Sequence, residues 1–137
     1  MYSATLMPQR HAMNATLELV LYGGRGVFWL DAVSLFPSDA VGGLFRRDIF
    51  ERLKALRPGF VRLPGGNALE GFGPRTRWRW KATVGHWAAR PGHYNAAWGY
   101  WVTDGLGVYE MLRLCELLDA PCMMSIYTGY SMRAQCA

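Results

Sequence analysis

The chain has 137 residues, which is the size of one ordinary domain with a single core. Apolar residues make up 51% and charged residues 18%, a composition that excludes an intrinsically disordered protein. The formal net charge of +5 permits nucleic-acid binding but does not indicate it. No apolar run approaches the roughly 20 residues that span a bilayer, and the N-terminus lacks the apolar stretch of an ordinary signal peptide. The protein is therefore expected to be intracellular, or to begin upstream of residue 1.

Residues 16–22 alternate leucine with other side chains, which predicts a half-buried strand. Gly23-Gly24-Arg25-Gly26 is typical of a turn, and residues 27–35 predict a second strand that is apolar on both faces. We expect the two strands to pair antiparallel. Because a hairpin alone is marginal in water, it needs further strands, which would lie before Met1.

Residues 44–56 place apolar side chains on one face of a helix that ends at Arg57-Pro58-Gly59. Residues 60–63 form a short predicted strand. Residues 64–103 are rich in Gly, Pro, Arg and Trp and are predicted to form a long loop, and loops of this length are usually functional.

A second helix is predicted over residues 105–118, with Thr103-Asp104 as its N-terminal cap, and residues 122–127 predict a buried strand. The order strand, helix, strand is the unit of a parallel sheet, so we expect strands 60–63 and 122–127 to be parallel neighbours. The fold class is α/β. Because a complete (β/α)8 barrel needs about 250 residues, the chain is expected to be a piece of a larger protein.

Ligands of α/β proteins bind at the carboxyl ends of the parallel strands, which points to the segment that starts at Arg62. Strand alternation puts Arg62 on the face opposite Val61 and Leu63. Gly65-Gly66 allows a close approach, and Asn67 offers donors and an acceptor that suit sugar hydroxyls. A structural arginine paired with an acid, followed by a mere turn, explains the same residues equally well.

Tryptophans alternate with arginines in the predicted loop. Aromatic rings stack on sugars, and the same pattern suits single-stranded nucleic acid. A third interpretation, which we favour for most of them, is that the rings form the loop's own small core. The tryptophans concerned are Trp78, Trp80, Trp87, Trp98 and Trp101.

Two acids, Glu70 and Asp104, lie near this region, and paired carboxylates perform glycosidic chemistry. Helix capping explains Asp104 as well, and an ion pair with a local arginine explains Glu70. His86 and His93 have no obvious acid partner, and the spacing of Cys115, Cys122 and Cys136 fits neither a zinc site nor a redox pair. No metal and no cofactor are expected.

Three stretches occur in an order that resembles the family 51 glycoside hydrolases, the α-L-arabinofuranosidases. They are FWLDAVSLFP, RRDIFERLKALRPGFVRLPGGNALEG and RWRWKATVGHWAARPGHYNAAWGYWVTDGLGVYEMLRLCELLDAP. The resemblance covers residues 27–130. It implies a retaining enzyme that removes terminal non-reducing α-L-arabinofuranosyl residues from arabinan and arabinoxylan, with a (β/α)8 catalytic barrel and accompanying β-sandwich domains.

On this resemblance, residues 1–36 are the last strands of a β-sandwich, and residues 37–137 are the first part of the catalytic barrel. Arg62 and Asn67 match the family's RxPGGN motif, although many eukaryote-type members carry Cys where this chain has Asn67. The implied substrate-binding residues are Arg62, Asn67, Glu70, Trp78 and Trp87.

The family's acid/base glutamate belongs to a WEIGNE-like motif, and its nucleophilic glutamate lies later. Neither motif occurs in this chain, and residues 128–137 depart from the family pattern. The implied partner is an arabinose-containing polysaccharide, with no nucleic acid and no membrane, and the family suggests an extracellular location. Two further hypotheses stay open: a non-catalytic carbohydrate-binding protein, and a basic, aromatic nucleic-acid binder.

Overall fold

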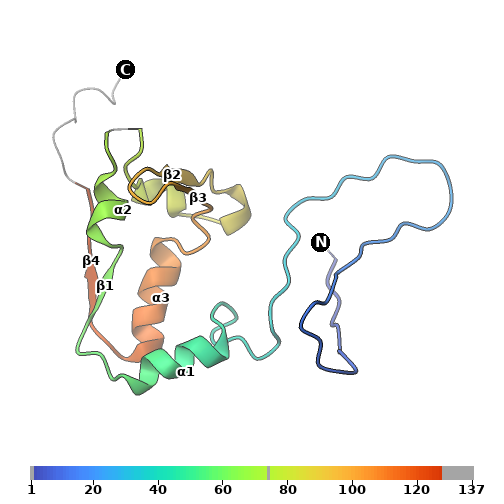
Figure 1. Cartoon of the computed structure of the whole chain (residues 1–137), viewed down its shortest axis with the longest axis horizontal. Coiled ribbons are helices and arrows are strands. Elements are labelled where there is room, and N and C mark those ends of the chain that lie inside the picture. Colours follow the sequence, from blue (N-terminus) through green and yellow to red (C-terminus); the bar gives the residue numbers. More distant parts are fainter. Residues whose placement is uncertain (1, 74, 128–137) are drawn as a thin grey trace. The chain divides into compact units, whose positions relative to one another are not determined.

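The computed structural model describes residues 2–73 and 75–127. The chain divides into two units, Met1–Asp31 and Ala32–Ala137, and each is described by itself. The helices and strands belong to the second unit, and Figure 1 labels most of them. In chain order they are α1 Arg47–Ala55, β1 Val61–Leu63, α2 Gly66–Glu70, the 3-10 helices η1 Trp80–Thr83 and η2 Trp87–Ala89, β2 His93–Asn95, β3 Tyr100–Val102, α3 Val108–Leu118 and β4 Cys122–Met124.

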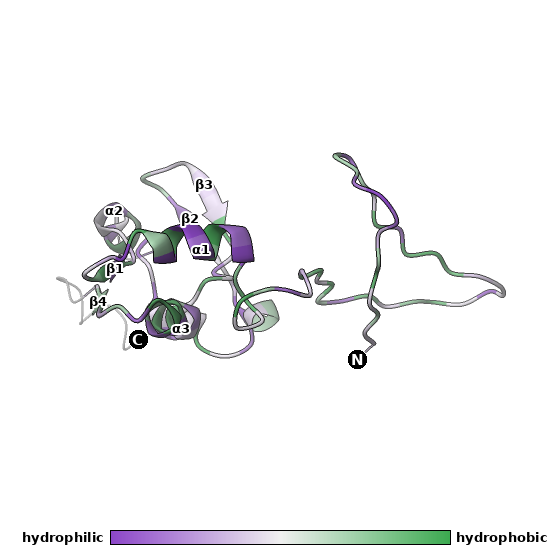
Figure 2. Ribbon diagram, turned by 90° about the horizontal axis from the view of Figure 1, so that it is seen from below, coloured by the Kyte–Doolittle hydropathy of each residue, from purple (hydrophilic) through white to green (hydrophobic). Residues whose placement is uncertain are grey.

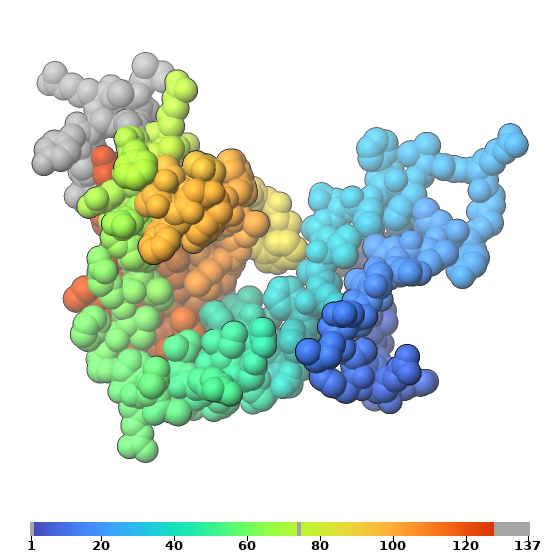
Figure 3. All heavy atoms as spheres, viewed as in Figure 1, coloured from blue at the N-terminus to red at the C-terminus, as the bar shows by residue number. Residues whose placement is uncertain are grey.

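The described part of the first unit, residues 2–31, contains no helix and no strand, and each of these residues is exposed. The predicted hairpin of strands 16–22 and 27–35 is therefore wrong. Leu21 and Trp29 keep 68% and 89% of their surface in water, so neither face of the expected hairpin is covered. Figure 3 shows these residues in blue as a thin run of atoms around open space. An apolar alternation forms a stable hairpin only when another layer packs on it.

The prediction of a parallel strand pair is confirmed. β1 pairs with β4 in parallel, with Arg62 opposite Met123, and both strands are shorter than predicted. The pairing extends beyond β4 because the Ser125 N–H donates to the Leu63 carbonyl at 2.8 Å. α3 lies between the two strands in sequence and runs beside them in Figure 1.

The two longer helices pack on one face of this pair. Phe50 of α1 is 4% exposed and lies in a core with Leu118, the last residue of α3, and with Ala120, which lies between α3 and β4. Val61 of β1 packs against the same core. Figure 2 shows hydrophilic and hydrophobic stretches along α1, as expected for a helix with one buried side. The predicted helices over 44–56 and 105–118 are confirmed, with later starts at Arg47 and Val108.

Residues 64–103, predicted as one loop, hold several short elements instead: α2, η1, η2 and an antiparallel hairpin of β2 and β3. Polar contacts rather than an apolar stripe organise this segment, and such contacts leave no periodic signal in the sequence. Within residues 2–73 and 75–127, none of the helices has the length and apolar character needed to cross a membrane.

Candidate functional site

Arg62 projects from the sheet face that the helices leave uncovered. Val61 and Leu63 are half-buried, whereas Arg62 and its register partner Met123 are exposed. A Cβ placed on Gly66 would lie 3.5 Å from Arg62 Nη2, so the guanidinium lies beside the first residue of α2. No carboxylate of the described residues forms an ion pair with Arg62.

Asn67 and Glu70 both lie on α2, the short helix that begins three residues after β1 ends. The sequence predicted a loop here, but the backbone is extended only as far as Gly65 and then becomes helical. Both side chains are exposed. Figure 1 shows α2 at the end of β1, so Arg62, Asn67 and Glu70 share the carboxyl-end region of the strand pair. The ion pairs found in the described residues do not include Glu70.

The two candidate tryptophans differ in exposure. Trp78 is 4% exposed, and its backbone N–H donates to the Leu69 carbonyl at 3.1 Å, which ties it to α2. Trp87 lies in η2, where its ring centroid is 5.2 Å from that of His86. The Trp78 side chain is therefore buried, whereas Trp87 is half-buried.

The interpretation of the tryptophans as a buried loop core is wrong for most of them. Trp80 is 38% exposed, and Trp98 and Trp101 are each 64% exposed. Trp78 is thus the buried one among the five. The exposed rings lie on η1 and on the β2–β3 hairpin, where they are accessible to solvent and to ligands.

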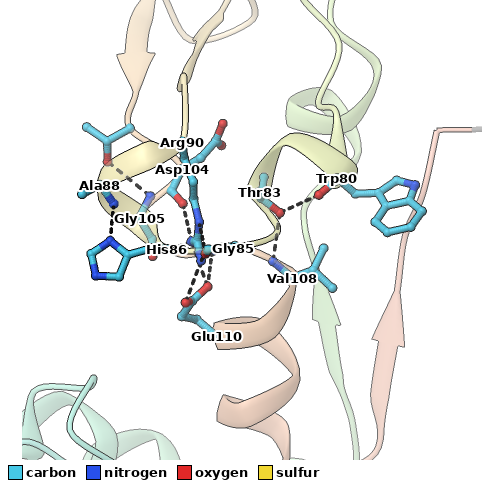
Figure 4. A network of polar contacts seen from close by, with 12 residues as sticks. Trp80, Thr83, Gly85, His86, Ala88, Arg90, Asp104, Gly105, Val108 and Glu110 are labelled. Atoms are coloured by element: carbon cyan, nitrogen blue, oxygen red, sulfur yellow. Dashed lines mark hydrogen bonds and ion pairs between the residues drawn. The ribbon is translucent and has the colours of Figure 1, made fainter.

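A buried ion pair links the segment that follows η1 to α3. The Arg90 side chain is 2% exposed and makes two 2.9 Å hydrogen bonds to the two carboxylate oxygens of Glu110. The same guanidinium donates to the carbonyls of Gly85 at 2.8 Å and Asp104 at 2.8 Å. Figure 4 shows these bonds converging on one side chain. Arg90 thereby links the backbone at Gly85 and at Asp104 to the first turn of α3.

Glu110 also caps α3. Its Oε2 accepts a 2.9 Å hydrogen bond from the Gly107 N–H, so the cap lies three residues later than the predicted Thr103-Asp104. Burial alone would raise the pKa of Glu110, but the hydrogen bonds from Arg90 and from backbone amides outweigh it, and the pKa lies below its ordinary value. A Cβ at Gly107 would lie 2.5 Å from the Thr83 carbonyl oxygen, so this close packing requires glycine.

Thr83 makes a second link between η1 and α3. It is fully buried, its hydroxyl donates to the Trp80 carbonyl at 2.8 Å, and it accepts from the Val108 N–H at 3.1 Å. Figure 4 shows this pair of bonds beside the Arg90 contacts. η1, which carries Trp80, is thus held in place by the first turn of α3.

Asp104 and His93 form a further buried pair. His93 Nδ1 lies 3.0 Å from Asp104 Oδ1, and the two side chains are 13% and 5% exposed. Two interpretations of the sequence are therefore wrong: Asp104 does not cap a helix, and His93 does have an acid partner. Because Asp104 is committed to His93, it is not free to act with Glu70 as a pair of catalytic carboxylates.

Cys115 and Cys122 are free thiols, the first buried and the second half-buried. Burial, reinforced by a hydrogen bond with Cys122, raises the pKa of the Cys115 thiol to about 12, so it stays protonated at neutral pH. Residues 2–73 and 75–127 contain no group of three or more His, Cys, Asp or Glu side chains arranged to hold a metal ion.

Sequence reasoning missed Arg90, Glu110 and Thr83 because each acts on residues far away in the chain. One local signal was available for Glu110. It follows Gly107 by three residues and precedes an apolar stripe, which is the spacing of a capping box with glycine at the N-cap.

Solved structures with this arrangement are α-L-arabinofuranosidases. An arabinose-bound GH51 α-L-arabinofuranosidase superposes with a TM-score of 0.61 and 44% identity, covering 67% of this chain and 14% of that one. The arabinose complex of the Thermotoga maritima enzyme gives a TM-score of 0.56 and 27% identity, covering 64% of this chain and 17% of that one. By fold, the chain is thus similar to part of a glycoside hydrolase.

The sequence comparisons identify the family. Residues 52–137 match the model of the Alpha-L-arabinofuranosidase 1 domain. α-L-Arabinofuranosidase 2 of Arabidopsis thaliana is 42% identical over 112 residues, 81% of this chain and 17% of that protein. α-L-Arabinofuranosidase 1 of the same plant is 40% identical over 108 residues, 78% of this chain and 16% of that protein. The chain belongs to the α-L-arabinofuranosidase family, as the sequence motifs predicted, and spans about a sixth of these relatives.

Proposed function

We propose that this chain is part of a retaining α-L-arabinofuranosidase that removes terminal non-reducing α-L-arabinofuranosyl residues from polysaccharides such as arabinan and arabinoxylan. One observation carries the proposal: in a chain of this family, Arg62 lies on a parallel strand with its guanidinium beside Gly66, the residue that precedes Asn67 on α2. The presence of arabinose in two similar solved structures supports the same substrate class.

In this proposal the chain supplies binding groups and the acid–base chemistry comes from elsewhere. Arg62 and Asn67 hydrogen-bond the arabinose hydroxyls and orient the sugar, Glu70 contacts it from α2, and Trp78 and Trp87 complete the surroundings. Retaining hydrolysis needs one carboxylic acid to protonate the leaving oxygen and one carboxylate, about 5 Å away, to form the glycosyl-enzyme. Both would be glutamates outside these 137 residues.

The proposal extends to the domain plan. Residues 37–137 would form the first part of a (β/α)8 barrel, with β1 and β4 as neighbouring barrel strands and α3 between them. Residues 1–36 would join a β-sandwich, whose other strands would cover the exposed apolar side chains of residues 16–35. An extracellular location is part of the proposal, supported by the extracellular exo-α-L-arabinofuranosidase of Streptomyces chartreusis, which is 39% identical over 118 residues.

The test is a segment exchange. Residues 52–137 of this chain replace the matching segment of the Arabidopsis thaliana α-L-arabinofuranosidase 2, and hydrolysis of 4-nitrophenyl α-L-arabinofuranoside is measured. We expect the hybrid to be active and the 137-residue chain alone to give no hydrolysis above background, because it lacks the two carboxylates. Robust hydrolysis by the purified chain alone would contradict the proposal.

Substitutions in the hybrid test the assigned residues. Arg62→Ala and Asn67→Ala should each lower kcat/KM about 10²-fold or more, as removal of one well-placed polar contact to a transition state does. Arg52→Ala is the matched control, since it removes another exposed arginine, from α1. An unchanged kcat/KM for Arg62→Ala would remove this residue from the site.

A second candidate, a non-catalytic carbohydrate-binding protein, rests on a different observation. The β2–β3 hairpin exposes four aromatic rings, which could stack on a polysaccharide. They are Tyr94, Trp98, Tyr100 and Trp101. This function predicts that the 137-residue chain binds arabinoxylan in affinity electrophoresis, that Trp98→Ala weakens binding, and that the hybrid enzyme is inactive.

A further inference from the structure

A hollow of about 450 Å³ lies in the same strand-end region as Arg62. Residues 77–82 line it together with Tyr127, which is three residues beyond β4. Trp78 is hydrogen-bonded to Leu69 of α2, so the wall formed by residues 77–82 is anchored beside the end of β1. The hollow thus belongs to the carboxyl ends of both parallel strands, where α/β proteins bind ligands.

The lining of this hollow is strongly cationic. Arg79 and Lys81 contribute two positive charges, and the lining includes no Asp or Glu. Across residues 2–73 and 75–127, the carboxylates form no ion pair with Arg79 or Lys81. Uncompensated positive charge in a concave site concentrates field and attracts an anion.

Aromatic rings provide the other part of the lining. Trp80 is 38% exposed, with Lys81 Nζ 5.7 Å from its ring centroid. Arg77 Cζ lies 5.0 Å from the ring centroid of Tyr127. Because cations already sit against these rings, a ligand that stacks on an aromatic face here meets a positive charge at the same time.

We propose that this hollow binds an acidic sugar, a hexuronate unit of the polysaccharide. The sugar ring packs on Trp80, and its carboxylate takes hydrogen bonds from Arg79 and Lys81. The inference rests on the proposed function, because it places the hexuronate next to the arabinose held by Arg62 and Asn67. A neutral sugar would leave the charges of Arg79 and Lys81 unmatched, whereas a carboxylate suits the planar donors of arginine.

The experiment titrates the full 137-residue chain with two sugars that differ in one group, methyl α-D-galacturonoside and methyl α-D-galactopyranoside, and follows tryptophan fluorescence. We expect the galacturonide to bind about tenfold more tightly at low salt, which is the effect of one charge-assisted hydrogen bond. The preference should shrink as NaCl is raised. Equal affinities, or no binding of the galacturonide, would overturn the inference.

Substitutions localise the effect. Arg79→Gln and Lys81→Gln should each reduce the preference for the galacturonide, and the double variant should abolish it. Arg52→Gln on α1 changes the net charge equally and should leave the preference intact. A preference that survives in the double variant would overturn the inference. If sodium acetate displaces the galacturonide at equal concentration, the hollow binds simple anions and the sugar assignment is wrong.

A parallel titration separates this inference from the proposed function. Methyl α-L-arabinofuranoside tests the arabinose site, and Asn67→Ala should abolish its binding while leaving galacturonide binding unchanged. If the unsubstituted chain prefers the galacturonide but does not bind the arabinofuranoside, the result counts against the proposed function alone. The opposite result would count against the acidic-sugar site alone.

Discussion

Residues 2–31 and residues 64–107 are both rich in turns and both poor in long regular elements, yet they differ completely in burial. The first segment carries exposed leucines and an exposed Trp29 and contains no buried residue. The second contains a buried tryptophan, a fully buried threonine and a buried arginine. What distinguishes them is a partner, because α3 offers the second segment a fixed helix end to bond to.

The comparison teaches that apolar side chains alone do not order a segment without long elements. In residues 64–107, hydrogen bonds from Arg90 and Thr83 to α3 and its neighbours hold the backbone, and Trp78 becomes buried. In residues 2–31, more large apolar side chains are available, but nothing that they could pack against is present in the unit. Conformational entropy of the chain then outweighs their burial.

Breaking the buried ion pair should lower the unfolding free energy more than the other substitutions proposed below. Glu110→Ala leaves the Arg90 guanidinium buried without its carboxylate, which we expect to cost about 3–5 kcal/mol of unfolding free energy. Urea unfolding followed by near-UV circular dichroism measures it. Asp48→Ala, which removes the exposed pair with Arg46, should leave the midpoint unchanged. Equal effects of the two variants would mean that Arg90 does not organise the segment.

The same pair predicts a pH dependence. Because the pKa of Glu110 is lower in the folded state than its ordinary 4.5, its contribution to stability is present above pH 4.5 and is lost as the pH falls below that value. The unfolding free energy of the natural chain should therefore drop in this acid range. In Glu110→Gln that part of the drop should be absent, and a persisting drop of the same size would assign it to other groups.

Two tryptophan truncations compare the regions directly. Trp78→Ala removes a ring that is 4% exposed and should cost about 3–5 kcal/mol. Trp29→Ala removes a ring that is 89% exposed and should change the urea midpoint very little. If Trp29→Ala proved as destabilising as Trp78→Ala, residues 2–31 would have a packed partner in solution.

A smaller effect is expected from Thr83→Val. The change keeps the side-chain volume but leaves the Val108 N–H without its acceptor, at a cost of about 1–3 kcal/mol. Thr16→Val is the control, because Thr16 is exposed and lies in the segment without buried residues. Unfolding monitored by tryptophan emission compares the two. A stabilising Thr83→Val would show that the hydroxyl contacts are replaceable by apolar packing.

The smallest effect should come from the exposed leucines. Leu19→Ser and Leu21→Ser, made together, should change the unfolding free energy by less than about 0.5 kcal/mol for each residue, because both side chains stay in water in the folded chain. Solubility should rise at the same time. A clear loss of stability in urea would contradict the exposure of this segment.

Periodic signals account for what the sequence predicted correctly. The apolar stripe of α1, the stripe of α3 and the short apolar strands β1 and β4 are local patterns, and each was found within a few residues of its true bounds. Their parallel pairing followed from the order strand, helix, strand. The placement of Arg62 on the face opposite Val61 followed from strand alternation.

Long-range polar contacts account for the features that the sequence did not predict. Arg90 and Glu110 are 20 residues apart and Thr83 and Val108 are 25 apart, so no window of local sequence contains either pair. The pairing of His93 with Asp104 spans 11 residues and was missed for the same reason. The false hairpin over 16–35 had the opposite cause: a local pattern was present, but its packing partner was not.

The two longer helices begin in different ways, and their amide hydrogens should exchange with solvent at different rates. The first amides of a helix normally lack a partner within it and exchange quickly. In α3 the Gly107 and Val108 amides are held by Glu110 and Thr83, whereas the start of α1 has no side-chain cap. The entry into α3 should therefore retain its protons long after that of α1 has lost them, so that a helix end becomes one of the slowest-opening points of the molecule.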